Sequence, residues 1–222
     1  MYALVCLREA VLARSTRESI LTAAAELMRH KGYAAVAMKD VVAASGAPIG
    51  SLYHHFPGGK TQIAREALLN AGAAYGLLIP TVIDPHDDLG EAVEAVFVQA
   101  AEDMASTGFA NMCPVGSVAG EVADTVQELR DATADIFTAW LDGGTAYFRS
   151  RGVPEPTARD LTVVLIGALE GAFVLARTLR SSEPLLAMGR VLSPQYRGVA
   201  LSAGASIATG GVSVPGPAAR GN

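Results

Sequence analysis

The chain has 222 residues and a mass of 22.9 kDa, enough for one or two domains with a sizeable core. Half of the residues are apolar and 18% are charged, a composition that excludes a chain disordered throughout. The two cysteines, Cys6 and Cys113, are far apart and belong to no CxxC motif and no Cys/His cluster. We therefore expect no disulfide framework, no metal site and no cofactor.

The net charge of -5 is distributed unevenly along the chain. Residues 1–70 contain eight Lys or Arg and five Asp or Glu. Residues 71–222 contain nine Lys or Arg and seventeen Asp or Glu. A small basic module in front of a larger acidic body is compatible with a polyanion-binding head. The opening residues are too short for a signal peptide, and the longest apolar stretch, residues 161–176, is too short for a membrane span. We expect a cytoplasmic protein without a membrane partner.

No segment alternates apolar and polar residues, so the chain is predicted to be all-α. Residues 1–14 form an N-terminal extension. The first helix begins at the capping box Ser15-Thr-Arg-Glu18 and ends at Gly32.

Two very short helices are predicted next, over residues 38–45 and residues 49–56. Gly46 ends the first of them, and Pro48 opens the second because proline is tolerated in a first turn. A fourth helix follows over residues 60–78, with apolar residues recurring along one face.

A linker rich in turn residues, 80–88, leads to the acidic body. Apolar periodicity predicts that the helices of this body cover residues 87–106, 115–123, 126–151, 158–180 and 185–192, with 201 as an alternative end of the last helix. The final residues, 202–222, are mostly Gly, Ala, Ser and Pro and are predicted to be a disordered tail. The domains are thus residues 15–62 for the head and 79–201 for the body.

Residues 40–56 have the pattern of a helix-turn-helix motif, in which the second helix enters a DNA major groove. The signature Gly-x-x-x-Gly-x-Leu-Tyr-x-His-Phe is met by Gly46, Gly50, Leu52, Tyr53, His55 and Phe56. The chain therefore resembles the TetR family of transcriptional repressors. The segments Phe-Pro-Gly-Gly-Lys at 56–60 and Met-Cys-Pro-Val-Gly-Ser-Val-Ala at 112–119 are similar to its LmrA/YxaF-like branch.

This resemblance implies an all-α fold with an N-terminal three-helix helix-turn-helix head and a C-terminal bundle for ligand binding and dimerisation. Phosphate contacts are expected from phenol, imidazole and ammonium groups and base readout from the outer face of the second short helix. The predicted DNA-binding residues are Lys39, Pro48, Ile49, Ser51, Tyr53, His54, His55, Lys60 and Thr61. The alternative is that Tyr53 belongs to the core and that the histidines are ordinary surface residues.

Two departures from the family pattern concern this surface. Val36, Ala37 and Met38 offer no hydroxyl to cap the second helix, so a phosphate contact is expected to be lost. Pro48 and Ile49 make readout from the first turn of the recognition helix largely apolar, for instance toward a thymine methyl.

In the body, the resemblance implies a cavity for a small apolar or aromatic effector, although each residue also fits an ordinary core. The candidate effector-binding residues are Phe97, Met104, Phe109, Met112, Phe137, Trp140, Tyr147 and Phe173. The most apolar helix contains Gly167-Ala-Leu-Glu-Gly171 and is expected to form a homodimer interface. The candidate interface residues are Leu161, Leu165, Gly167, Ala168, Gly171, Ala172, Leu175 and Leu179.

The sequence thus predicts a homodimeric repressor that binds a near-palindromic operator, with half-sites roughly 34 Å apart, and is released by its effector. An enzyme is not favoured, since Glu170 has no evident His or Lys partner and the Gly59-Lys60-Thr61 segment lacks the first glycine of a P-loop. The remaining alternative is a ligand-binding or scaffold protein of the same fold with a non-functional DNA-binding head.

Overall fold

The computed structural model describes residues 15–208, which form helices and short connections without any strand in that range. The predicted all-α fold is confirmed. The expected extension over residues 1–14, Cys6 and residues 209–222 lie outside the described residues.

Three helices form the head: α2 (Thr16–Lys31), α3 (Met38–Ser45) and α4 (Ile49–His55). The predicted capping box is present, since Ser15 Oγ accepts from Glu18 N at 3.2 Å and Ser15 N donates to the Glu18 carboxylate at 2.9 Å. Gly46 ends α3 in the left-handed conformation, with φ of 68°, which turns the chain into α4. The helix-turn-helix geometry therefore follows from local sequence signals.

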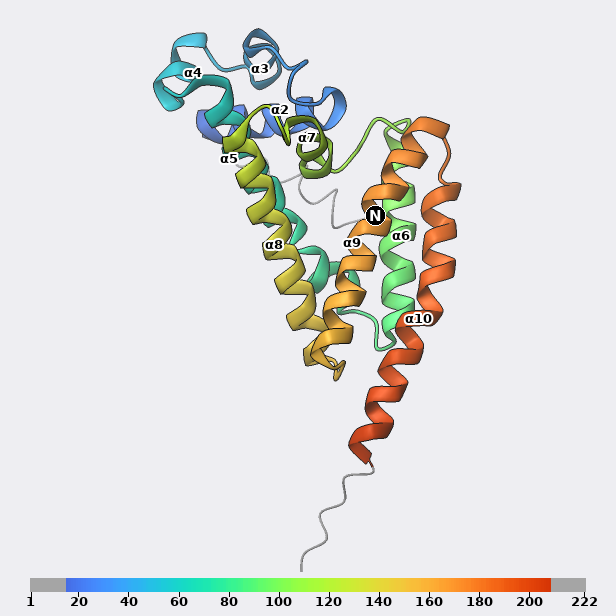
Figure 1. Cartoon of the computed structure of the whole chain (residues 1–222). Helices are drawn as coiled ribbons and strands as arrows, with labels where there is room; N and C mark the ends of the chain where they lie inside the picture. Colours follow the sequence, from blue (N-terminus) through green and yellow to red (C-terminus); the bar gives the residue numbers. More distant parts are fainter. Residues whose placement is uncertain (1–14, 209–222) are drawn as a thin grey trace, which may run out of the picture.

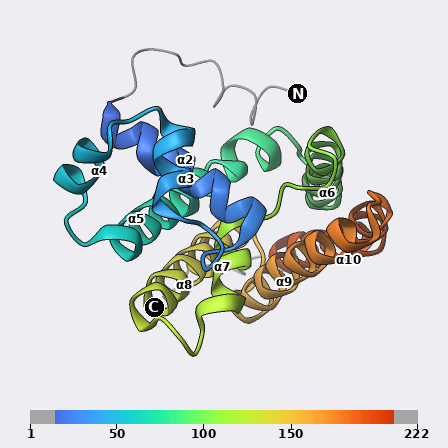
Figure 2. The same ribbon diagram turned by 90° about the horizontal axis from the view of Figure 1, so that it is seen from above.

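The rest of the described chain forms an elongated bundle that extends away from the head (Figure 1). Its elements are α5 (Gly59–Tyr75), the π-helix η1 (Ile79–Ile83), α6 (Leu89–Ser106), α7 (Pro114–Val122), α8 (Gln127–Ser150), α9 (Glu155–Leu179) and α10 (Glu183–Ala208). Seen from above, α9 lies between α8 and α10, and α6 lies beside α10 (Figure 2).

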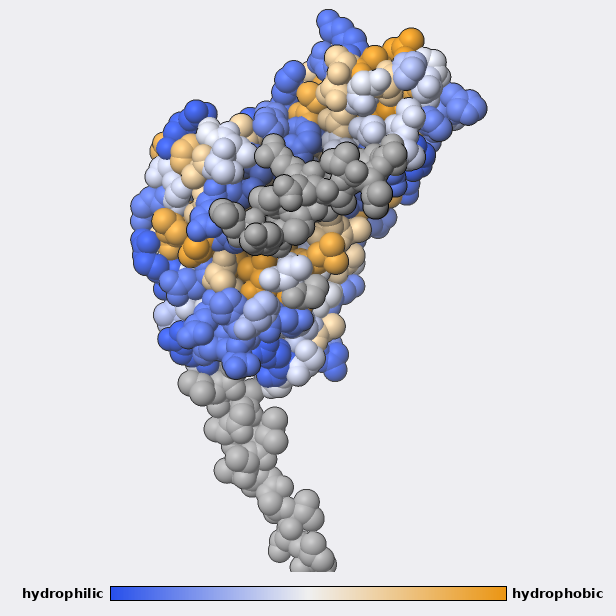
Figure 3. Space-filling model, turned by 180° about the vertical axis from the view of Figure 1, so that it is seen from behind, coloured by the Kyte–Doolittle hydropathy of each residue, from blue (hydrophilic) through white to orange (hydrophobic). Residues whose placement is uncertain are grey.

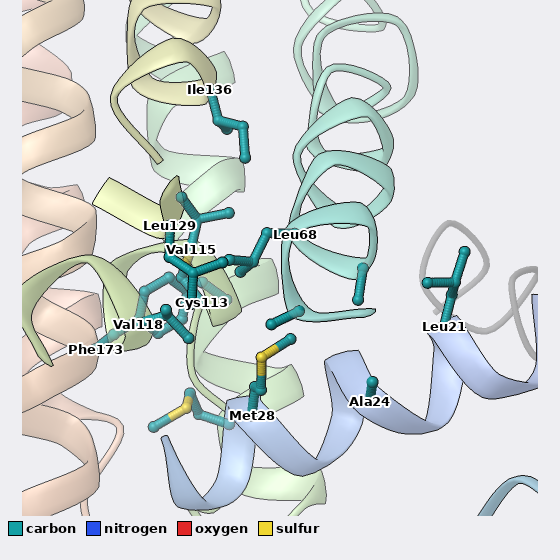
Figure 4. Close-up of a cluster of buried hydrophobic side chains, with 14 of the residues drawn as sticks. Leu21, Ala24, Met28, Leu68, Cys113, Val115, Val118, Leu129, Ile136 and Phe173 are labelled. Atoms are coloured by element: carbon teal, nitrogen blue, oxygen red, sulfur yellow. The ribbon is translucent and has the colours of Figure 1, made fainter. Parts of the chain in front are cut away.

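One apolar core joins the head to the body. Met28 of α2 is buried against this core, as are Val118 of α7 and Phe173 of α9 (Figure 4). Helices α5 and α8 approach closely at Gly72, where an added Cβ would lie 2.6 Å from Ile136 Cγ2. The packing of α2 against the body helices is therefore continuous.

The predicted end of the fourth helix was wrong, and of the predicted linker over residues 80–88 only residues 84–88 are non-helical. Helix α5 ends at Tyr75 because Gly76 N and Leu77 N bond to carbonyls three residues back, which tightens the last turn. The π-helix η1 then occupies the start of the expected linker. Pro80 is tolerated in its first turn, and Ile83 packs into a small cluster with Ala92 and Val96 of α6.

The last helix is also longer than predicted. Helix α10 continues to Ala208, so the tail expected from residue 202 is helical over its first seven residues. Alanine recurs at positions 200, 203, 205 and 208, and its high helix propensity favours continuation beyond the last apolar stripe. Helix α9 begins at Glu155, three residues before the predicted start, with Pro156 in its first turn.

Helix α9 is the one helix of the described residues that is long and apolar enough to cross a membrane, by length and composition only. One such helix is weak support for a span, since helices packed inside soluble proteins pass the same test. The face of the molecule opposite Figure 1 is mostly hydrophilic, with apolar side chains in separate patches (Figure 3).

Candidate nucleic-acid interface and ligand site

Helix α4 presents one buried and one exposed face at the tip of the head. Leu52 and Phe56 are completely buried in the core that α4 shares with α2 and α5. On the other face, Ile49 and Tyr53 are each 54% exposed, and His54 is exposed beside them. Tyr53 is therefore a surface residue and the alternative that it belongs to the core is wrong.

The remaining α4 candidates surround this exposed face. Pro48 is the exposed N-cap residue, and its carbonyl accepts from Ser51 N at 3.0 Å. Ser51 and His55 are half-buried, and the His55 ring lies 6.4 Å from Phe56. The outer face thus combines an aliphatic side chain, a phenol and an imidazole, which suits apolar contact with a base together with hydrogen bonds to phosphates.

Lys39 and Lys60 lie in different surroundings. Lys39 is exposed in the first turn of α3. Lys60 Nζ instead donates to Ala34 O at 3.1 Å and lies 4.4 Å from the centre of the Tyr33 ring. The Tyr33 hydroxyl is bonded in turn to Thr61 at 3.1 Å. Lys60 and Thr61 therefore hold the loop after α2, and the ammonium group of Lys60 retains donors beyond the one that Ala34 O accepts.

The expected loss of a hydroxyl cap on α3 is confirmed. Ala37 is the N-cap residue and no side chain bonds to the first amides of the helix. The acidic Asp40 lies in this first turn and faces Lys31 at 3.9 Å. The negative charge offsets part of the missing cap through the helix dipole.

The eight predicted effector-binding residues are divided between core positions and a looser aromatic group. Phe97, Met104 and Phe173 are buried in the core. Phe109 and Met112 are half-buried in the connection before α7. The interpretation as ordinary core fits the three buried side chains.

An aromatic cluster lies lower between α5 and α8. The Trp140 ring centre is 5.5 Å from that of Tyr75 and 5.4 Å from that of Phe137, and Trp140 Nε1 donates to Gly72 O at 2.9 Å. All three rings are half-buried. Tyr147 does not belong to this cluster. Its ring contacts Phe148, and its hydroxyl accepts a hydrogen bond from Arg151 at 2.6 Å. The structure thus brings together Phe137 and Trp140 of the predicted set and adds Tyr75.

Two polar residues that were not among the candidates occupy the same interior. Cys113 is buried, and its Sγ accepts from Gly116 N at 3.4 Å as the N-cap of α7. The half-buried carboxylate of Glu170 on α9 lies against Gly116 in the first turn of α7. Burial raises the pKa values of Glu170, Cys113 and Tyr75 because the charged form of each is poorly solvated. The sequence signal for this group was Glu170 itself, the one acid in an apolar stretch.

Long-range hydrogen bonds attach the end of α2 to the body, and no motif in the sequence predicts them. Arg177 of α9 donates to Arg29 O at 3.2 Å and to His30 O at 2.6 Å. Glu121 of α7 accepts from the amides of Tyr33 and Ala34, both at 2.6 Å. We call Arg177 and Glu121 the α2 clamp. They satisfy backbone groups at the end of the first head helix from two different body helices.

Asn111 joins the same region from the connection before α7. The Arg29 guanidinium donates to Asn111 Oδ1 at 2.8 Å, and Asn111 Nδ2 donates to the carboxylate of Asp103. Arg177 also donates to Ala110 O at 3.2 Å. The end of α2, the connection before α7 and helix α9 therefore form one hydrogen-bonded junction.

The candidate interface residues of α9 are divided between its two faces. Gly167, Gly171, Leu175 and Leu179 are exposed, whereas Leu161, Leu165 and Ala168 are half-buried against the core. Ala172 is completely buried within the chain, so it is not available to a second copy and that assignment was wrong. The exposed face also contains residues that the prediction missed: Val163, Val164 and Val174.

Within residues 15–208, no group of three or more His, Cys, Asp or Glu side chains is placed to hold a metal ion.

The chain matches two family descriptions that together cover most of its described length. "Bacterial regulatory proteins, tetR family" matches residues 20–71, and "Transcriptional regulator LmrA/YxaF-like, C-terminal domain" matches residues 90–191. The boundary between them falls close to the end of α5.

Curated relatives cover most of the chain. An uncharacterized HTH-type transcriptional regulator of Mycobacterium tuberculosis is 36% identical over 76% of this chain and 88% of its own. The HTH-type transcriptional regulator LmrA of Bacillus subtilis is 32% identical over 77% of this chain and 91% of its own.

Solved structures show the same fold. The regulatory protein TetR from Rhodobacter sphaeroides superposes with a TM-score of 0.73 at 22% identity, covering 82% of this chain and 100% of its own. A TetR transcriptional regulator from Chloroflexus aurantiacus gives a TM-score of 0.65 at 27% identity, covering 81% of this chain and 92% of its own.

Proposed function

Since the chain belongs to the TetR family of transcriptional regulators and has an LmrA/YxaF-like C-terminal domain, we propose that it is a homodimeric, effector-responsive repressor acting on operator DNA in the cytoplasm. The observation that carries this proposal is the exposed face of α4, where Ile49, Tyr53 and His54 are free while Leu52 and Phe56 hold the helix in the core. No catalytic role is proposed.

The second copy of the chain is proposed to pack on the exposed face of α9. This face combines aliphatic side chains with Gly167 and Gly171, where no other part of residues 15–208, apart from the α9 backbone itself, lies within 4 Å of an added Cβ. Small residues let a second helix approach closely, and branched aliphatic side chains supply apolar area. Dimerisation also accounts for the apolar character of α9 without a membrane.

The α2 clamp supports a route from effector to DNA. An effector that displaces α7 or α9 would shift Glu121 or Arg177 and with them the end of α2. Because α2 shares the head core with α4, the spacing of the two recognition helices in a dimer would change. Differential affinity of the effector for the two spacings supplies the coupling free energy.

The proposed DNA binding is tested by enrichment of genomic fragments on the purified full-length protein, followed by sequencing. Wild type should enrich a few fragments that share a near-palindromic sequence. Ile49→Asp should lose this enrichment, whereas Val98→Asp, which changes an exposed apolar residue on α6, should retain it. Fragment profiles that are equal for wild type and Ile49→Asp would refute the proposed recognition helix.

The alternative function is ligand binding with a non-functional head. The uncapped start of α3 favours this alternative, because it removes a phosphate contact. Salt-dependent binding to duplex DNA separates the two functions, since a non-functional head gives no specific enrichment under any salt condition.

A further inference from the structure

The connection between α5 and α6 is attached to the body at few points. We call residues 76–87 the strap, and Figure 1 shows it at the end of the body that lies away from the head. Among the side chains that the structure describes there, only Ile83 is buried, whereas the apolar Leu77 is 56% exposed. A segment with so little buried apolar surface can open without unfolding of the whole chain.

The buried residue of the strap does not belong to the main core. Ile83 packs with Ala92 and Val96 of α6 in a separate small cluster. The strap residues around it form the π-helix η1, after which Asp84 N donates to Ile79 O at 2.9 Å. Single π-helical turns are rare and often occur at functional sites. Release of the strap would therefore break the small cluster and leave the main core intact.

Arg151, the C-cap residue of α8, attaches the other end of the strap to the body. Its guanidinium donates to His86 O at 3.2 Å and to Asp87 O at 2.6 Å. The same group donates to the Tyr147 hydroxyl at 2.6 Å and lies 5.7 Å from the centre of the Tyr147 ring. One half-buried side chain therefore joins the strap to a residue of the body.

The strap adjoins the part of the body that contains the aromatic rings. Tyr147 and Leu169 contact both the small cluster of the strap and the main core. Tyr75 is the last residue of α5, directly before the strap, and its ring centre lies 5.5 Å from that of Trp140. Opening of the strap would therefore uncover Tyr147 and Leu169 and loosen the chain beside Tyr75.

We propose that the strap opens as one unit and that the effector enters the body through this opening. The inference rests on the proposed function for the meaning of the entering molecule as an effector. Two independent sets of contacts keep the strap closed, namely the hydrogen bonds of Arg151 and the apolar contacts of Ile83. Removal of either set should increase the open population without unfolding the rest of the chain.

Hydrogen exchange of the purified full-length protein, without DNA or ligand, measures the opening. The amides of Asp84 and His86 are bonded within the strap, and they should exchange once it is released because so short a helix is unstable without packing. Arg151→Met should speed their exchange by about tenfold or more, the factor expected for one hydrogen bond from a charged group. Arg149→Met, which removes a surface ion pair with Glu155, should leave their exchange unchanged.

Ile83→Ala tests the second set of contacts. It should also speed exchange of the strap by about tenfold or more, since a buried isoleucine loses most of its packing. The matched truncation Ile63→Ala lies in the core of the head and should destabilise the whole chain without faster exchange in the strap. Exchange of Asp84 and His86 at the rate of amides in the middle of α8 would overturn the inference, because the strap would then open only by global unfolding. Equal exchange of the strap in wild type and Arg151→Met would overturn it as well.

Entry through the opening is measured with phenylnaphthylamine, an uncharged aromatic dye whose fluorescence rises in apolar surroundings. In stopped-flow mixing, its association rate constant should be about tenfold higher for Arg151→Met than for wild type or Arg149→Met, in proportion to the open population. No binding of the dye, or equal association rates in the three proteins, would refute this entry route. Neither experiment contains DNA. A chain whose strap opens and admits the dye, but that enriches no genomic fragment, would keep the strap and lose the proposed repressor function.

Discussion

Helices α4 and α9 both expose apolar side chains, but their surroundings give the exposure two different meanings. On α4, a helix of 7 residues, Ile49 and Tyr53 lie beside His54 at the tip of the head. On α9, a helix of 25 residues, Val174 is 52% and Leu179 is 62% exposed along a face that also contains glycines.

The difference shows how exposed apolar residues are to be interpreted. A short face with a phenol and an imidazole offers hydrogen bonds as well as apolar contact, which is what a DNA groove requires. A long face of aliphatic residues and glycine offers apolar surface area and lets another backbone approach closely. These are the requirements for packing against another helix. Substitutions on one face should therefore leave the function of the other face intact.

The largest effect is expected from a charge on the α9 face. Val174→Arg would place two like charges in a two-fold symmetric interface, where each buried unpaired charge costs several kcal/mol, so the dimer should weaken at least about 1000-fold. Light scattering coupled to gel filtration should report a monomer for Val174→Arg and a dimer for wild type. Val98→Arg, the same change on α6, should remain dimeric. A dimeric Val174→Arg would place the interface elsewhere.

A charge on the α4 face should affect DNA and nothing else. Ile49→Asp should weaken operator binding by roughly 100-fold, since each protomer loses an apolar contact worth about 1–3 kcal/mol and gains repulsion from phosphates. Anisotropy of a labelled duplex measures the affinity, and light scattering should still report a dimer. Loss of the dimer in this variant would mean that the two faces are not independent.

Disruption of the α2 clamp should cause a moderate loss of stability. Arg177→Met removes the donor to carbonyls at the end of α2 and should lower the free energy of unfolding by about 2 kcal/mol, which is several degrees in Tm for a chain of this size. Arg190→Met is the matched control, because Arg190 pairs with Glu183 at the surface and should contribute little. Thermal unfolding followed by circular dichroism compares the two variants. Equal Tm values for Arg177→Met and Arg190→Met would show that the α2 clamp does not stabilise the fold.

The smallest effect is expected from Glu170→Gln, which should increase the stability of the fold. Burial raises the pKa of Glu170 above 4.5, so the folded chain holds this proton more tightly than the unfolded chain and loses stability as the pH rises past that value. The pKa values of the neighbouring Cys113 and Tyr75 are raised as well, so both stay neutral in this range. Glu170→Gln should therefore have a higher Tm than wild type at neutral pH and the same Tm below pH 4.5. A lower Tm at neutral pH would contradict the cause assigned to the shift.

Local signals made the head predictable from the sequence. The capping box at Ser15, the left-handed Gly46 and Pro48 before α4 each specify a boundary through a few adjacent residues. Leu52 and Phe56 are spaced to lie on one face of a helix, so their burial follows from periodicity, whereas the structure was needed to decide that Tyr53 is exposed.

The structure of the body depends on contacts between residues that are far apart in the sequence. Hydrophobic periodicity carries no information about such contacts. Ala172 and Leu175 both belong to an apolar helix, and only the packing of α8 and α10 decides that one is buried and the other exposed. The α2 clamp joins residues that are 147 and 88 positions apart. The π-helix η1 likewise needs the neighbouring α6 for its apolar residues to pack.

The central claim is that the exposed face of α4 recognises a specific DNA sequence. The most direct measurement is the anisotropy of a labelled duplex taken from an enriched genomic fragment, beside a scrambled duplex, at low and physiological salt. Wild type should prefer the native duplex by about 1000-fold or more at physiological salt, and Ile49→Asp should lose this preference. Equal affinity of wild type for the two duplexes at both salt concentrations would contradict it.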